Sequence, residues 1–270
     1  MTDRERLRRK RLFLLDMDGT LYLDENLFDG AAAFLQTIRD SGGRYLFLTN
    51  NSSRSGGAYV EKMRRLGVEA ERGDFLTSVD ATIAYLREHD GQDKLYYVCG
   101  TESFRTQLRE AGFHLTDDRD APVDTLLMGF DTELTFRKLE DACILLNNGA
   151  DWIATNPDWV CPTWYGSVPD CGSVCQMLTR ATGREPVFIG KPKPDMVYLA
   201  MEAVSAGPEE TLLIGDRLYT DIACGVNAGI ETALVLSGET TLEQAKASDI
   251  KPTYVFDDIG TLSAALQAAR

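Results

Sequence analysis

At 270 residues, the chain is long enough for one large domain or two smaller ones with substantial buried cores. A content of 44% hydrophobic and 26% charged residues is typical of a globular protein and excludes a disordered or fibrous chain. With 42 acidic against 28 basic side chains, the net charge of −14 repels nucleic acid and anionic membranes, so we expect neither as a partner.

The N-terminus carries the only basic cluster. Its members are Arg4, Arg6, Arg8, Arg9, Lys10 and Arg11. We interpret the cluster as a solvated N-terminal extension rather than an RNA-binding arm. A signal peptide would need an apolar region of about seven residues, but Leu12–Leu15 is followed at once by Asp16. No stretch approaches the roughly 20 apolar residues that span a bilayer, so we expect a cytoplasmic protein.

Short apolar runs alternate with longer amphipathic stretches along the whole chain. Most of these runs are continuously apolar, which is typical of parallel strands buried on both faces. We expect strands at Arg11–Leu15, Arg44–Leu48, Leu95–Val98, Thr125–Met128, Trp152–Ala154, Val187–Ile189, Thr211–Ile214, Thr232–Leu236 and Thr253–Phe256. The alternation predicts an α/β fold with a mostly parallel sheet and helices on both of its faces.

Helical and loop patterns fill the intervals. Apolar residues in Thr135–Asn148 recur at spacings of three, four and three, so they share one helix face. Similar patterns predict helices over Ala31–Ser41 and Asp195–Val204. Two stretches rich in turn-forming residues, Arg72–Ser78 and Asn156–Gly172, predict loops. The chain between roughly Val79 and Arg184 could be an inserted lobe, but the pattern alone does not decide this.

The chain has six cysteines, at positions 99, 143, 161, 171, 175 and 224. Cys161, Cys171 and Cys175 lie near one another in sequence, so a metal cluster can be imagined. A thiolate zinc site usually shows two tight Cys/His pairs, and neither His89 nor His114 pairs with a cysteine. We interpret the cysteines as buried free thiols in a reducing cytosol.

Four of the predicted strands end in polar groups. The four segments that follow them are Asp16-Met17-Asp18-Gly19-Thr20, Thr49-Asn50-Asn51-Ser52-Ser53, Gly190-Lys191-Pro192 and Gly215-Asp216-Arg217-Leu218-Tyr219-Thr220-Asp221. Open parallel sheets bind ligands beyond the carboxyl ends of their strands. If these strands lie side by side, one edge of the sheet collects several carboxylates, a hydroxyl group, amides and one lysine.

Such crowded carboxylates would repel one another unless a cation joins them. Mg²⁺ prefers a few carboxylate oxygens, waters and a phosphate group. Lys191 and Thr49 could then hold the remaining phosphate oxygens. Of the two carboxylates in Asp16 and Asp18, one could attack phosphorus while the other carries a proton to the leaving oxygen.

Each motif alone also has an ordinary explanation. An Asp-x-Asp pair is common in loops, and Thr49-Asn50-Asn51-Ser52 could cap the helix that follows it. Lys191 could lie in a surface turn, and Asp221 could be a helix cap or an acceptor that orients another group. Their occurrence together at four strand ends favours a functional site.

Taken in order, the four segments resemble the motifs of the haloacid dehalogenase-like (HAD) phosphatases. The resemblance runs from about Arg11 to the C-terminus. It is greatest to the branch with the NagD-like and 4-nitrophenyl phosphatases, pyridoxal phosphate phosphatase and phosphoglycolate phosphatase. Leu48-Thr49-Asn50-Asn51 and the run from Gly215 to Asp221 are forms typical of this branch.

The resemblance implies a role for each motif residue in the reaction. Asp16 would be the nucleophile that forms an aspartyl-phosphate, and Asp18 the acid that protonates the leaving alcohol and later activates water. Thr49 and the Asn50 amide would hold the phosphoryl oxygens, while Lys191 would bridge the phosphoryl group and the nucleophile.

The resemblance also implies a magnesium site. Asp16, Asp216 and the main-chain carbonyl of Asp18 would ligate Mg²⁺, and Asp221 would support them from outside the ligand set.

By the same resemblance, we expect a Rossmann-like, doubly wound parallel-sheet core formed by residues 1–78 and 185–270. An α/β cap domain, residues 79–184, would be inserted into it, cover the site and select the leaving group. Related enzymes often dimerise through this cap, so a homodimer is a further expectation. Asn156-Pro157-Asp158 resembles a recurring cap segment of the branch, although a simple turn explains it equally well.

The expected function is magnesium-dependent hydrolysis of a small phosphorylated metabolite. A phosphotransferase or mutase using the same aspartyl-phosphate is an alternative. A receiver-like phospho-acceptor module is another, but receivers are roughly half this length or less, and Asp18 would speed the loss of a stored phosphoryl group. The sequence does not distinguish sugar phosphates, nucleotides, phosphoglycolate and pyridoxal phosphate as substrates.

Overall fold

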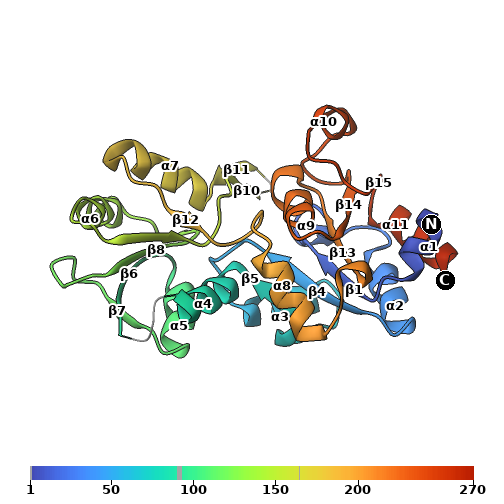
Figure 1. Ribbon diagram of the computed structural model, residues 1–270, viewed down its shortest axis with the longest axis horizontal. Helices are drawn as coiled ribbons and strands as arrows, with labels where there is room; N and C mark the ends of the chain where they lie inside the picture. The colour runs from blue at the N-terminus through green and yellow to red at the C-terminus, as the bar shows by residue number, and fades with distance from the viewer. Residues whose placement is uncertain (1, 90–92, 164) are drawn as a thin grey trace. The chain divides into compact units, whose positions relative to one another are not determined.

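The computed structural model describes residues 2–89, 93–163 and 165–270, and the chain forms two compact units (Figure 1). Unit 1 comprises Met1–Thr49, Tyr59–Leu76 and Lys191–Arg270, whereas unit 2 comprises Asn50–Ala58 and Thr77–Gly190. The bounds differ from the expected ones at the junctions, because residues 50–58, 77–78 and 185–190 cluster with unit 2.

Unit 1 is built on a six-stranded sheet with the order β15-β14-β13-β1-β4-β5. These strands are β1 (Leu12–Leu15), β4 (Arg44–Thr49), β5 (Phe75–Thr77), β13 (Thr211–Gly215), β14 (Glu231–Val235) and β15 (Tyr254–Phe256). Strand β1 pairs in parallel with β13 on one side and β4 on the other. The chain continues from β1 in both directions across the sheet, so β1 lies at the topological switch point, where ligands bind in such sheets.

Helices cover both faces of this sheet. They are α1 (Asp3–Arg8), α2 (Ala31–Asp40), α3 (Gly56–Arg65), α8 (Asp195–Val204), α9 (Ala223–Asn227), α10 (Leu242–Ala247) and α11 (Ile259–Ala269). Phe13 and Leu15 share a core cluster with α2 and α11, and α8 packs against β1 and β4. Because Leu12 and Leu14 are fully buried as well, both faces of β1 are covered.

Short elements join these helices and strands. They are β2 (Tyr22–Leu23), β3 (Asn26–Leu27), η1 (Arg72–Asp74), η2 (Pro208–Glu210) and η3 (Leu218–Ile222). Strands β2 and β3 form an antiparallel hairpin just after the first motif.

Unit 2 contains a five-stranded parallel sheet with the order β12-β9-β8-β6-β7. Its strands are β6 (Leu95–Cys99), β7 (His114–Thr116), β8 (Thr125–Met128), β9 (Asp151–Ala154) and β12 (Val187–Phe188). An antiparallel hairpin and four helices complete it: β10 (Val160–Thr163), β11 (Gly166–Pro169), α4 (Ser78–His89), α5 (Glu102–Glu110), α6 (Phe136–Asn147) and α7 (Cys171–Thr182). Its core packs Leu126, Trp152 and Leu178 together. The α/β prediction is therefore confirmed.

All nine predicted strands form, to within one residue at each end. Three of the four motif-bearing strands lie side by side, in the order β13-β1-β4, whereas β12 pairs with β9 in unit 2. The two predicted loops were also partly wrong. Arg72–Ser78 contains η1 and β5, and Asn156–Gly172 contains the β10–β11 hairpin. Strands of three or four residues are too short to give a clear periodicity.

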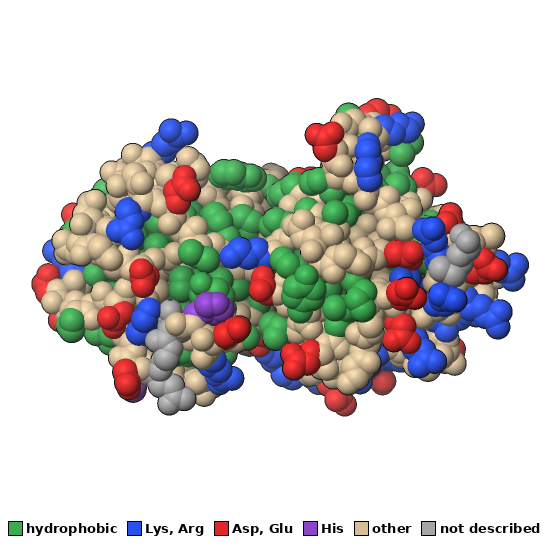
Figure 2. All heavy atoms as spheres, viewed as in Figure 1, with side chains coloured by type: hydrophobic (Ala, Val, Ile, Leu, Met, Phe, Trp, Pro, Cys, Tyr) green, Lys and Arg blue, Asp and Glu red, His purple; other side chains and the backbone are tan. Residues whose placement is uncertain are grey.

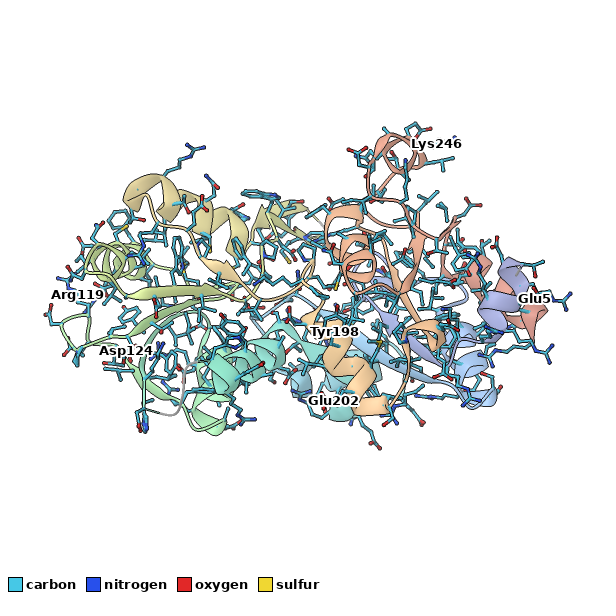
Figure 3. All side chains as sticks on the ribbon, in the orientation of Figure 1. Glu5, Arg119, Asp124, Tyr198, Glu202 and Lys246 are labelled. Atoms are coloured by element: carbon cyan, nitrogen blue, oxygen red, sulfur yellow. The ribbon has the colours of Figure 1, made fainter. Side chains whose placement is uncertain are left out.

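The N-terminal segment is only partly the solvated extension that was predicted, because Arg4, Arg8, Arg9 and Arg11 are exposed whereas Leu7 and Lys10 are buried. It contains α1, whose Glu5 (labelled in Figure 3) exchanges two hydrogen bonds with Thr2 in a capping box. Lys10 is buried, donates to the carbonyls of Glu209 and Thr211, and lies 3.1 Å from a Glu231 carboxylate oxygen. The segment is thus part of the fold of unit 1.

Other charged side chains of both signs are scattered over the face in Figure 2. In the described part of the chain, no helix combines the length and the apolar character that crossing a bilayer requires. All six cysteines are free, and those at positions 99, 171, 175 and 224 are buried as predicted. Cys143 and Cys161 are only half-buried, so the prediction of burial was wrong for these two.

Candidate active site

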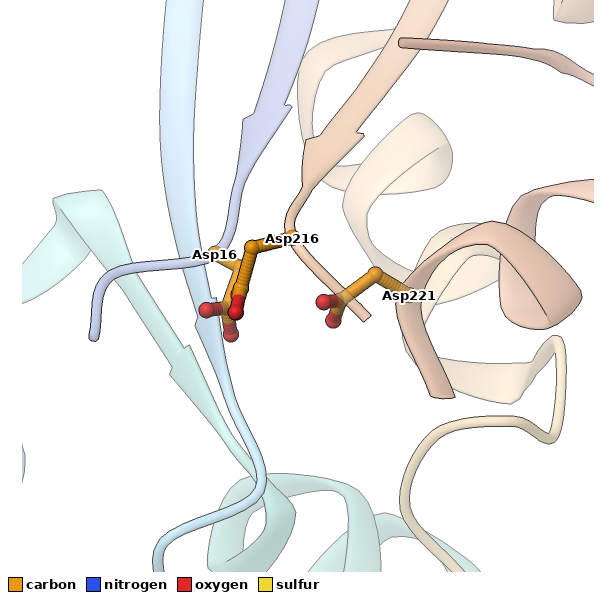
Figure 4. Close-up of side chains that lie close together, drawn as sticks. All are labelled: Asp16, Asp216 and Asp221. Atoms are coloured by element: carbon orange, nitrogen blue, oxygen red, sulfur yellow. The ribbon is translucent and has the colours of Figure 1, made fainter. Parts of the chain in front are cut away.

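Three aspartates meet at the carboxyl ends of β1 and β13 (Figure 4). Asp16 follows β1, and its N–H donates to the carbonyl of Ile214 at 2.9 Å, which continues the pairing of the two strands by one step. Asp216 follows β13, and Asp221 lies on η3, which comes next along the chain. One carboxylate oxygen from each of Asp16, Asp216 and Asp221 lies within 4.8 Å of the other two.

Lys191 places an ammonium group between two of these aspartates. Its Nζ lies 2.6 Å from Asp16 Oδ1 and 2.6 Å from Asp221 Oδ1, and it also donates to the Leu48 carbonyl at 3.2 Å. Burial alone would lower the pKa of Lys191, but the Asp16 and Asp221 carboxylates raise it. The ammonium group therefore stays charged and joins the ends of β1, β4 and η3.

The segment after β14 holds Asp216 in place. The Glu239 N–H donates to Asp216 Oδ2 at 2.7 Å, and the Thr20 hydroxyl donates to Asp216 Oδ1 at 3.3 Å. Gly238 packs so closely that a Cβ there would lie 2.0 Å from Asp216 Oδ2. At Gly19, whose φ is +86°, a Cβ would lie 2.6 Å from the same oxygen. The backbone therefore fixes the carboxylate on two sides.

The charges of this cluster do not balance. Burial raises the pKa of Asp16 well above its usual range, and the nearby Asp221 and Asp216 raise it further. Burial, followed by the charge of Asp221, raises the pKa of Asp216 to about 6. Among the described residues, Lys191 supplies the single ammonium group that pairs with this cluster, and it contacts two of the three carboxylates, those of Asp16 and Asp221.

A divalent cation fits this donor set. The shared span of 4.8 Å resembles the distance between opposite oxygen ligands of one hard cation, about 4–5 Å for ligand distances of 2.0–2.6 Å. Two positive charges would also offset the excess negative charge that raises the aspartate pKa values. The residues present thus suit a hard divalent metal ion.

Of the remaining predicted site residues, Asp18 and Thr49 belong to unit 1 and Asn50 to unit 2. The Asp18 carboxyl group is outside the aspartate cluster and more exposed, and Lys62 is 3.6 Å from it. Thr49 is buried at the end of β4. The Asn50 carboxamide donates to Asp158 Oδ1 at 3.0 Å within unit 2, so the side chain of Asn50 is already engaged. The catalytic and binding roles of these residues stay predictions.

Several contacts of the predicted residues were not found from the sequence. Within unit 2, the main-chain carbonyl of Asn50 accepts hydrogen bonds from the Ser78 hydroxyl at 2.6 Å and the Asn156 amide at 2.5 Å. Asn156 and Asp158 therefore support Asn50, whereas the sequence left their role open. In unit 1, Thr20 and Gly238 were missed as partners of Asp216.

Known proteins share this arrangement across most of the chain. A model of the haloacid dehalogenase-like hydrolases matches residues 13–114, and a second HAD-hydrolase-like model matches residues 188–262. An acid sugar phosphatase of Staphylococcus haemolyticus is 34% identical over 255 residues, which cover 94% of this chain and 96% of the relative.

Two solved structures extend the likeness to the fold. A 4-nitrophenylphosphatase from Thermotoga maritima superimposes with a TM-score of 0.91 at 40% identity, covering 97% of this chain and 99% of that one. A glycerol phosphate phosphatase from Mycobacterium tuberculosis, solved in complex with magnesium, has a TM-score of 0.89 at 28% identity, covering 96% and 78% of the two chains. This chain therefore belongs to the haloacid dehalogenase-like hydrolases, in the branch of the NagD-like phosphatases.

Proposed function

We propose that this protein hydrolyses a small phosphomonoester with the help of Mg²⁺, through an aspartyl-phosphate on Asp16. The observation that carries the proposal is the convergence of Asp16, Asp216, Asp221 and Lys191 at the carboxyl edge of one parallel sheet. A nucleophilic carboxylate paired with an ammonium group is what phosphoryl transfer to an aspartate requires.

The reaction has two balanced steps. In the first, a carboxylate oxygen of Asp16 forms a bond to phosphorus while the bond to the leaving oxygen breaks, and Asp18 gives that oxygen its proton. In the second, Asp18 takes a proton from water, whose oxygen attacks phosphorus and releases the Asp16 carboxylate. Lys191 stabilises the phosphoryl oxygens throughout, with Thr49 and the Asn50 backbone amide as further donors.

Mg²⁺ would be held by Asp16, Asp216 and the main-chain carbonyl of Asp18, with Asp221 beside them. When bound, it supplies positive charge that offsets both the carboxylates and the phosphate dianion. The donor set and the span of the three carboxylates support this assignment, as does the magnesium complex of the similar glycerol phosphate phosphatase.

The similar proteins point to a small phosphorylated sugar or polyol as the substrate class. The names of two of them, acid sugar phosphatase and glycerol phosphate phosphatase, support this. We assign the catalytic core to unit 1, and to unit 2 the part of a cap that selects the leaving group and provides a surface for dimerisation. Six free cysteines fit a reducing compartment and support a cytoplasmic location.

The test replaces the nucleophile by its neutral isostere. Asp16→Asn should abolish phosphate release from 4-nitrophenyl phosphate in MgCl₂, and EDTA should abolish release by the unchanged protein. Asp249→Asn makes the same chemical change at an exposed site and should leave the rate unaltered. Full activity of Asp16→Asn would refute the assignment of the nucleophile. Transfer of phosphate to added sugars, in place of its release, would favour a phosphotransferase.

A further inference from the structure

Besides Lys10 and Lys191, unit 1 contains a buried ammonium group on Lys62, and the reaction described above does not use it. Lys62 lies on α3, and its side chain is 10% exposed. Removing an ammonium group from water costs several kcal/mol unless other groups compensate for it. Its Nζ lies 3.6 Å from Asp18 Oδ1 and 3.9 Å from the centroid of the Tyr22 ring. The compensation thus comes from the loop that carries Asp18.

The Tyr22 ring is a fixed support for this ammonium group. The Met17 carbonyl accepts from the N–H groups of Thr20, Leu21 and Tyr22, so the segment forms a tight turn. The Gly19 N–H donates to the Tyr22 carbonyl at 2.9 Å, and the Tyr22 ring is fully buried. A cation over a desolvated aromatic face gains about 2 kcal/mol or more. Lys62 is therefore held at a set position relative to the backbone of Asp18.

Asp18 is the group that needs such a neighbour. Its side chain is 39% exposed, so packing alone does not select one of its rotamers. A general acid must nevertheless come within about 3 Å of the leaving oxygen to transfer its proton. Lys191 cannot orient it, because that ammonium group is engaged by Asp16 and Asp221. Lys62 is the cation that the structure places beside Asp18.

We propose that Lys62 is a positioning residue for Asp18: its ammonium group, seated on the Tyr22 ring, directs the Asp18 carboxyl group toward the leaving oxygen. The proposal rests on the phosphomonoesterase reaction proposed above. Lys62 acts through Asp18 and does not touch the reacting atoms. Its removal should therefore slow the first step more for a leaving oxygen that needs a proton than for one that leaves without a proton.

The experiment compares two substrates of nearly the same shape. The 4-nitrophenolate ion leaves readily without a proton, whereas phenolate is a poor leaving group that depends on the acid. We would measure kcat/KM for 4-nitrophenyl phosphate and phenyl phosphate with Lys62→Met, Lys62→Arg and the unchanged protein. Arg64→Met is the matched control, because it removes one positive charge from an exposed position on the same helix.

The ratio of the two kcat/KM values is the decisive quantity. It is measured on one preparation, so the fraction of active enzyme cancels. Lys62→Met keeps an unbranched side chain that is one atom shorter and buries no charge, so the fold should persist. Its kcat/KM should fall about 10-fold more for phenyl phosphate than for 4-nitrophenyl phosphate, a part of the 10²–10⁴-fold that a general acid supplies.

Lys62→Arg keeps the charge and stacks well on an aromatic ring, so its ratio should stay near that of the unchanged protein. Arg64→Met should leave the ratio unaltered. An equal fall for both substrates would overturn the proposal, as would a loss carried by KM alone, since that indicates direct contact with substrate. Absence of magnesium-dependent turnover in the unchanged protein would overturn the proposed function together with the role of Lys62.

Discussion

Asp216→Asn should stabilise unit 1 in the absence of metal while removing part of the metal site. Burial and the charge of Asp221 raise the pKa of Asp216 from 3.8 to about 6. Between these two pH values the folded protein holds a proton that the unfolded chain has already released. The stability of the folded state therefore falls as pH rises through this window, and it stays lower above it.

The size of the effect follows from the shift in pKa. Each unit is worth about 1.4 kcal/mol, so the ionised Asp216 lowers the free energy of unfolding by about 3 kcal/mol at pH 7.5. At pH 5 the decrease in the free energy of unfolding is about half as large, because Asp216 is still mostly protonated in the folded state at this pH. The carboxylate is almost completely buried, so solvent screens little of this cost.

Asparagine can keep the hydrogen bonds of the carboxylate. Its carbonyl oxygen can accept from the Glu239 N–H, and its amide group can donate to the Thr20 hydroxyl oxygen. We therefore expect Asp216→Asn to be more stable than the unchanged protein by about 3 kcal/mol at pH 7.5 and by about half of that at pH 5. Sites that bind charged ligands commonly trade stability for function in this way.

Hydrogen exchange in EDTA is the appropriate measurement, because the three tryptophans of the sequence, at positions 152, 159 and 164, fall outside the segments of unit 1 and their fluorescence would not report on it. The slowest backbone amides of β13 should exchange about 100-fold more slowly in Asp216→Asn at pH 7.5, and Asp249→Asn should exchange like the unchanged protein. Adding MgCl₂ should slow exchange in the unchanged protein more than in Asp216→Asn. Faster exchange in Asp216→Asn would refute the reasoning, since the carboxylate would then be stabilised by its partners.

Two further substitutions test the packing against Asp216 and the counter-charge of Asp16 and Asp221. Gly238→Ala would push a methyl group onto Asp216 Oδ2, so the Mg²⁺ concentration for half-maximal phosphate release should rise about 10-fold or more; an unaltered concentration would mean that Asp216 does not hold the cation. Lys191→Met would leave Asp16 and Asp221 without their shared counter-charge. Hydrogen exchange of the β1 amides should therefore show that the free energy of unfolding falls by about 3 kcal/mol at pH 7.5. The loss should shrink at pH 5, where the carboxylates take up protons, and a loss independent of pH would contradict this account.

The strands could be predicted from the sequence because burial on both faces gives a continuous apolar run. Every residue of β1 is fully buried, and its apolar run gives its position almost to the residue. The same pattern says nothing about which sheet a strand joins. Val187–Phe188 has the composition of the other strands, but it pairs at the edge of the sheet in unit 2. Pairing depends on tertiary contacts that a local apolar pattern does not encode.

Asp16 and Asp216 could be predicted because they directly follow β1 and β13, and parallel strands bring their carboxyl ends to one edge. The same argument does not explain Lys191, because β12 before it pairs in the other sheet. Gly238 could not, because a glycine after β14 has the appearance of an ordinary turn residue. Lys62 was hidden among charged neighbours on α3. Its spacing from the buried Tyr59 and Met63 places it on the core-facing side of that helix, which was the available signal.

The acidic cluster also sets an order for binding. Three carboxylates with one ammonium group between two of them would repel a phosphate dianion. A bound divalent cation reverses the sign of that interaction, so the affinity for phosphate should depend on prior binding of the metal. The cluster can persist without the metal because β1 and β13 are held by cores on both faces, whose hydrophobic burial far exceeds the about 3 kcal/mol lost at Asp216. The sheet thus holds the mutually repelling carboxylates in position until a bound cation offsets their negative charge and allows the phosphate to bind.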